Sequence, residues 1–206
     1  MSNSLKPTGY HIKTFRMLLN TENPEWLKEN QKRFQEVQRF YCEILQKTPH
    51  LYEMGSQQIL RELELMTIPS KNNPGVERQI PWEKLPAYFR RAAINSVIGD
   101  LKSAFTRSNG QSIQIMTQSS AIFYQRMYRD FTNKKITLHV WNGEDWVWLK
   151  CRLHGNELPD ADIEGVKWMS PTVVIEKNKI FLSVPVRLPV DDARKLKQRM
   201  ADVKEA

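Results

Sequence analysis

The sequence of 206 residues is poor in cysteine, with only Cys42 and Cys151, which lie far apart along the chain. Two cysteines cannot build the disulfide framework of a small secreted domain, so their number fits a reducing compartment. The first residues contain no apolar segment of signal-peptide length, and no apolar run approaches the roughly 20 residues that span a bilayer. We therefore expect a cytoplasmic protein without membrane contact.

The sequence also lacks the residue groupings of common catalytic centres. It contains no Gly-rich phosphate loop, no GxSxG motif and no Cys-His-Asn set. The acidic segment around Asp160 and Asp162 lacks the further ligands of a calcium loop. Cys151 and His154 have metal-like spacing, but no second pair completes a zinc site. We therefore expect no catalytic residue, no metal and no cofactor.

Positive charge is present in excess. Lys and Arg number 31 against 23 Asp and Glu, which gives a formal net charge of +8. Hydrophobic residues make up 40% and charged residues 26%, a balance that is ordinary for a globular protein with a sizeable core. An excess of cations favours contact with phosphate groups, and the competing interpretation is a soluble protein that is merely basic. Charge alone leaves both interpretations open.

Hydrophobic periodicity predicts one strand, then helices, then strands again. The first strand is expected at 9–19, and helices are expected from 24 to about 49, at 56–66 and at 86–106. Asn23 suits the N-cap of the first helix, and Pro24 suits its first turn. Period-two alternation then predicts strands at 122–129, 135–141, 146–153, 172–176 and 180–188. Asn142-Gly143 is a strong hairpin signal between two of these strands.

The lone first strand cannot be stable by itself, so we expect it to join the later strands. The predicted fold class is therefore α+β, a small β-barrel interrupted by an α-helical insertion. Residues 1–20 together with 112–190 would form the barrel, and 21–111 would form the insertion. The charge-rich segment 191–206 is expected to be a linker or a terminal helix.

Aromatic rings and cations are interleaved on two of the predicted strands, where bases could stack on the rings while the cations meet phosphates. The residues of these strands are Tyr124, Arg126, Arg129, Trp146, Trp148, Lys150 and Arg152. The third predicted helix adds Arg90, Arg91, Lys102 and Arg107. The competing interpretations are rings that cover the core and helical cations that are simply solvated. We take all eleven residues as candidates for contact with nucleic acid.

Two runs of the sequence resemble a known family. The run 80–103, IPWEKLPAYFRRAAINSVIGDLKS, is similar to a helix of the transposon-encoded TnpB proteins, also labelled OrfB transposases. The run 167–186, KWMSPTVVIEKNKIFLSVPV, resembles the hairpin that precedes their RuvC nuclease domain. The order of strand, helices and returning strands also resembles their layout, which the small type V CRISPR effectors share. The resemblance extends over about residues 10–190.

The resemblance implies that the barrel at 1–20 plus 112–190 is an OB-like wedge domain and that 21–111 is a helical recognition lobe. In that family these parts hold a guide RNA scaffold and help to read the target, while guide pairing reads the sequence. The implied partners are a structured guide RNA and a double-stranded DNA target. The carboxylates that cut DNA lie downstream in the family's RuvC part, so no catalytic residue is carried over.

Three hypotheses follow. The first is the binding half of an RNA-guided nuclease, nucleoid-associated in the cytoplasm and unable to cut DNA alone. The second is the first chain of a split endonuclease, in which a separate RuvC-bearing chain supplies catalysis. The third is a basic interaction module whose Trp-rich hairpin docks another protein.

Overall fold

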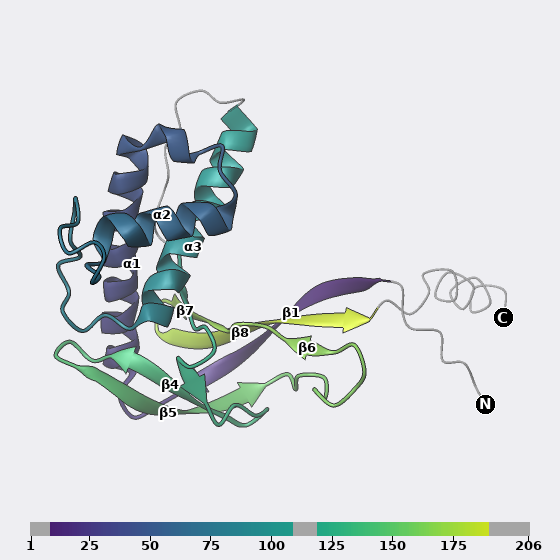
Figure 1. The fold of residues 1–206 in the computed structure, drawn as a ribbon. Coiled ribbons are helices and arrows are strands. Elements are labelled where there is room, and N and C mark those ends of the chain that lie inside the picture. Colours follow the sequence, from purple (N-terminus) through teal and green to yellow (C-terminus); the bar gives the residue numbers. More distant parts are fainter. Residues whose placement is uncertain (1–8, 109–118, 190–206) are drawn as a thin grey trace, which may run out of the picture.

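The computed structural model describes residues 9–108 and 119–189. These residues form an α+β fold with three α-helices and one antiparallel sheet, which curls into a half-barrel (Figure 1). The predicted fold class is therefore confirmed as α+β, with helices that follow the first strand in the sequence. Parts of the predicted barrel, at 1–8, 112–118 and 190, and the predicted terminal segment 191–206 lie outside the described residues.

The first half of the chain forms the strand and the three α-helices that its periodicity predicts, together with a short 3-10 helix that was not predicted. They are β1 (Tyr10–Asn20), α1 (Pro24–Lys47), the short 3-10 helix η1 (Pro49–Leu51), α2 (Ser56–Thr67) and α3 (Ala87–Ser108). Pro24 lies in the first turn of α1, where its missing N–H is not needed and its fixed φ suits a helix. The apolar stripe of α1 faces the core, with Phe34, Val37 and Tyr41 fully buried.

The second half of the chain forms most of the sheet. Its strands are β2 (Ala121–Ile122), β3 (Tyr128–Arg129), β4 (Lys135–Trp141), β5 (Trp146–Gly155), β6 (Lys167–Trp168), β7 (Thr172–Glu176) and β8 (Lys179–Pro189). The order across the sheet is β2-β7-β8-β1-β5-β4-β3, and β6 pairs with β8. β1 lies in the middle because it pairs with β8 along one edge and with β5 along the other. The expectation that the first strand joins the later ones is confirmed.

The predicted single strand at 122–129 is wrong. The segment forms β2 and β3, separated by a turn in which the Met127 N–H donates to the Tyr124 carbonyl at 2.8 Å. Arg126 lies in this turn with a φ of 76°, a left-handed conformation that interrupts the alternation of a strand. Tyr124, Arg126 and Arg129 therefore do not share one strand face. β6 was not predicted, because a strand of two residues is too short to show a period-two alternation.

One continuous hydrophobic cluster joins the helices to the sheet. Phe34 of α1 and Phe89 of α3 pack edge to face with ring centroids 5.3 Å apart, and Phe89 also contacts Trp146 of β5 at 4.8 Å. The Asn30 side-chain oxygen of α1 accepts a hydrogen bond from the Trp141 N–H of β4 at 3.0 Å. These contacts hold the turn end of the β4–β5 hairpin against the helices.

Candidate nucleic-acid interface

The β4–β5 hairpin divides its side chains between the core and the surface. Leu138 pairs with Leu149 and both are buried, as are Ile136 and its partner Cys151. Side chains alternate along a strand, so the residues between them point to the opposite side of the sheet. We call this set the hairpin face: Lys135, Thr137, His139 and Trp141 of β4, with Trp146, Trp148, Lys150 and Arg152 of β5.

The rings of the hairpin face centre on His139 and Trp148, which lie opposite each other in the register. Their ring centroids are 4.7 Å apart and their planes differ by 22°, so the two rings are stacked. Arg129 of β3 holds its guanidinium 4.3 Å from the Trp148 ring centroid, a cation–π contact. Trp148 still exposes 40% of its surface. An exposed ring that its neighbours hold in place is suited to stacking on a base.

Cations continue the hairpin face beyond the rings. Lys150 and Arg152 are exposed on β5, and Arg152 lies between Asn20 of β1 and Lys135 of β4 in the register. Within residues 9–108 and 119–189, no carboxylate forms an ion pair with Lys135, Lys150 or Arg152. Their positive charge is therefore uncompensated at short range and can attract phosphate groups.

His139 contributes a neutral ring to this surface. Its pKa lies below the ordinary 6.5, because burial disfavours the charged form and the Arg129 guanidinium adds repulsion, which Asp145 opposes only in part. The imidazole is therefore mostly uncharged near pH 7. A neutral ring stacks on Trp148 without the desolvation cost of a charge.

A cavity of about 300 Å³ opens where the hairpin face meets the helical part of the fold. Trp141 and Trp146, whose ring centroids are 5.8 Å apart, line the cavity together with Trp82 from the loop before α3. Arg33 of α1 holds its guanidinium 4.6 Å from the Trp141 ring centroid and 5.7 Å from that of Trp82. The other charged residues of the lining are Lys84, Glu83 and Glu144.

Two predicted cations of the third helix are engaged within the fold. The Glu64 carboxylate of α2 accepts hydrogen bonds from Arg90 at 2.8 Å and from two nitrogens of Arg91 at 2.9 Å each. Arg90 exposes only 11% of its side chain, whereas Arg91 exposes 47%. Arg90 and Arg91 therefore connect α3 to α2 through Glu64. These hydrogen bonds involve no residue of the hairpin face.

The other two predicted helical cations donate hydrogen bonds to backbone carbonyls. The Lys102 ammonium donates hydrogen bonds to the carbonyls of Tyr52 and Met54 at 2.7 Å and 2.6 Å. These bonds give two backbone carbonyls of the loop after η1 a hydrogen-bond partner. Arg107 donates to the Ser103 carbonyl at 3.2 Å, one turn earlier in α3. The bonds of Lys102 therefore hold α3 against the loop after η1, whereas the bond of Arg107 is local to α3 and leaves this residue exposed.

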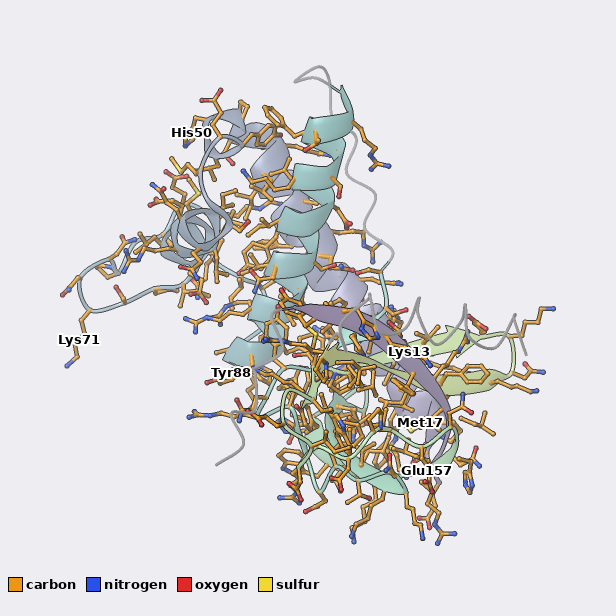
Figure 2. All side chains as sticks on the ribbon, turned by 90° about the vertical axis from the view of Figure 1, so that its right-hand side faces the viewer. Lys13, Met17, His50, Lys71, Tyr88 and Glu157 are labelled. Atoms are coloured by element: carbon orange, nitrogen blue, oxygen red, sulfur yellow. The ribbon has the colours of Figure 1, made fainter. Side chains whose placement is uncertain are left out.

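The turn between β2 and β3 directs two further predicted residues toward α3. The Tyr124 hydroxyl accepts a hydrogen bond from Asn95 of α3 at 3.0 Å. The Arg126 guanidinium lies 5.4 Å from the ring centroid of Tyr88, which sits at the end of α3 nearest the sheet (Figure 2). Of the eleven predicted residues, the structure therefore gathers five at the hairpin: Arg129, Trp146, Trp148, Lys150 and Arg152.

Sequence reasoning missed Arg33, Trp82, His139 and Trp141 as members of the site. For His139 and Trp141 a partial signal existed, because the alternation of 135–141 places them on one face of the strand. Their positions opposite Trp148 and Trp146 follow from a four-residue turn at 142–145, in which the Asn142 side-chain oxygen accepts hydrogen bonds from the N–H groups of Glu144 and Asp145. Arg33 and Trp82 had no such signal. They reach the cavity only because α1 and the loop before α3 fold against the hairpin.

Neither 9–108 nor 119–189 contains three or more His, Cys, Asp or Glu residues grouped to hold a metal ion. None of the helices in these two ranges has the length and apolar character to cross a membrane.

A family model matches residues 11–142, which is more than half of the chain. The chain belongs to the Aq_aa04 family. The match runs from β1 through the three helices to the turn after β4, so it includes Arg33, Trp82 and Trp141. No curated protein matches the sequence. The family name describes no activity, and the function has to be argued from the site.

Proposed function

We propose that the protein binds nucleic acid through its hairpin face. The observation that carries this proposal is Trp148, an exposed ring that stacks on His139, contacts Arg129 and lies next to cations without carboxylate partners among the described residues. A base stacks on the ring system while the strand's phosphates meet Lys150 and Arg152. Arg129 exposes 55% of its side chain, so it can leave the ring for a phosphate when a base arrives.

The charge pattern favours nucleic acid over a protein partner. Cores of protein–protein interfaces are depleted of charged residues, whereas Lys150, Arg152 and Lys135 follow the rings directly on the hairpin face. An apolar partner would remove water from these cations and offer no opposite charge in return, which costs free energy. Against a polynucleotide the same cations release condensed counterions and gain free energy.

The resemblance to TnpB proteins suggests the first ligand to test, a structured guide RNA, and after it a double-stranded DNA target. Under this proposal the curled half-barrel is a wedge-type, OB-like domain and the helical part is a recognition lobe. The chain would then act as the binding half of an RNA-guided nuclease. A separate RuvC-bearing chain would supply cleavage in the split form of the same proposal.

The test is the salt dependence of binding to a labelled RNA that contains single-stranded loops. We expect the wild-type affinity to fall steeply with salt, and we expect the double variant Lys150→Ala/Arg152→Ala to reduce the slope by about 0.7 for each lost phosphate contact. Trp148→Ala should weaken binding about tenfold, since one base–ring stack contributes on the order of 1–3 kcal/mol.

The matched control removes two positive charges elsewhere. Lys47 ends α1, and Lys71 lies at the tip of the loop between α2 and α3, away from the sheet (Figure 2). Lys47→Ala/Lys71→Ala should keep the wild-type slope and affinity. If this control weakens binding as much as the hairpin variant, overall charge and not the hairpin face explains the affinity. Absence of any RNA or DNA binding would favour a protein-docking module.

A further inference from the structure

The cavity beside the hairpin face has the lining of a site for one flat aromatic group. Three indoles, from Trp82, Trp141 and Trp146, contribute to it. Its volume of about 300 Å³ lies at the lower end of the roughly 300–1,000 Å³ range of small-molecule sites. A pocket of this size holds a single base with its sugar, and it is too small for a stacked base pair.

The charges of the lining argue against a cationic ligand. Arg33 already places its guanidinium within 4.6 Å of the Trp141 ring centroid and 5.7 Å of that of Trp82. The Arg33 Nε lies 3.4 Å from the Glu36 carboxylate, and its guanidinium already takes the position near these rings that a cationic ligand would occupy. Arg33 and Lys84 instead suit the phosphate of a nucleotide, and Glu83 and Glu144 can accept hydrogen bonds from the amino groups of a base.

The position of the cavity connects it to the proposed binding surface. Trp141 and Trp146 belong both to the cavity and to the hairpin face, and the Trp146 ring lies 5.6 Å from that of His139. His139 in turn stacks on Trp148. A strand that follows the cations and Trp148 therefore reaches the cavity at the end of the row of rings.

We infer that this cavity takes one unpaired base of a strand bound to the hairpin face, so that the protein selects single-stranded over double-stranded segments. The inference rests on the proposed function. In a duplex every base is stacked and paired, and placing one in the cavity requires unstacking and unpairing, which costs a few kcal/mol. An unpaired base avoids that cost.

The experiment compares one labelled strand, free and annealed to its complement, with wild-type protein and two cavity variants. Leu85→Trp fills the cavity without removing any of its indoles, and Trp82→Ala removes one indole that is not part of the hairpin face. Trp82 also packs on Phe40 at 5.7 Å, so thermal melting accompanies both variants, and the filled variant serves where Trp82→Ala unfolds.

We expect wild-type protein to bind the single strand about tenfold more tightly than the duplex, and Leu85→Trp to remove this preference while its duplex affinity and salt slope stay unchanged. A folded Leu85→Trp variant that keeps the full preference overturns the inference but leaves binding by the hairpin face intact. Wild-type protein that binds neither strand nor duplex overturns the proposed function and the inference with it.

Discussion

At the scale of single residues, Glu64 explains why the most promising cations of the helices are not free. Burial alone would raise the pKa of this carboxyl, but hydrogen bonds from Arg91 and Arg90 lower it more, so the pKa lies below the ordinary value of 4.5. The carboxylate is thus charged at neutral pH, and both arginines donate hydrogen bonds to it. The sequence showed two adjacent cations, and it gave no indication that a carboxylate of another helix neutralises them.

The two arginines should differ in their contribution to stability. Arg90 is nearly buried and Arg91 is half exposed, so solvent can replace the second partner of Glu64 but not the first. We expect Arg90→Met to lower the free energy of unfolding by about 2–3 kcal/mol and Arg91→Met by about 1 kcal/mol or less. Urea denaturation measures both. An Arg91→Met variant that is the less stable of the two would contradict the assignment.

His139 should make stability sensitive to acid. Its pKa is depressed in the folded protein, so below the unfolded value of 6.5 the unfolded chain binds more protons than the folded one. The contribution of His139 is therefore complete above pH 6.5 and is lost as the pH falls through its folded pKa. We expect His139→Gln to lose less unfolding free energy than wild type between about pH 7.5 and about pH 5.5. Equal losses would show that His139 titrates normally.

At the scale of elements, the β4–β5 hairpin was predictable and the β2–β3 turn was not. The predicted strands 135–141 and 146–153 agree with β4 (Lys135–Trp141) and, except for its last two residues, with β5 (Trp146–Gly155). Local signals suffice there, because alternation defines both strands and the Asn142-Gly143 signal marks the turn, which in the structure extends over 142–145. In the β2–β3 turn, Arg126 has a left-handed φ of 76° that its sequence does not announce. Residues of this turn contact α3, as Arg126 contacts Tyr88. Contacts between segments so distant in the sequence cannot be predicted from the local sequence.

The hairpin turn offers a test of how the register is fixed. Gly143 has a φ of +109°, and the nearest atom to an added Cβ is 4.0 Å away, so a substitution there causes backbone strain and no clash. We expect Gly143→Ala to lower the free energy of unfolding by about 1–2 kcal/mol. Gly75→Ala is the matched control, because a Cβ added to Gly75 meets no atom within 4 Å and the φ of Gly75 lies outside the left-handed region. Equal stability of the two variants would contradict this account.

At the scale of the whole molecule, the candidate site combines segments that are distant in the sequence. The hairpin supplies Trp146 and Trp148, α1 supplies Arg33, and the loop before α3 supplies Trp82. β1 precedes α1 in the chain and pairs with β5, and α1 packs against both α3 and β4, so these contacts place the helices beside the hairpin. The α+β class, the order of elements and the hairpin rings were predictable from patterns, whereas this assembly required the fold.

The most direct test of the central claim is to map where a bound strand touches the protein. Ultraviolet cross-linking of a single-stranded RNA to wild-type protein, followed by mass spectrometry of the peptides, gives this map. We predict adducts in β5, at Trp146 and Trp148 and their neighbours, and in the loop that carries Trp82. Adducts confined to α2 or to the loop around Lys71, with β5 unmodified, would contradict binding by the hairpin face.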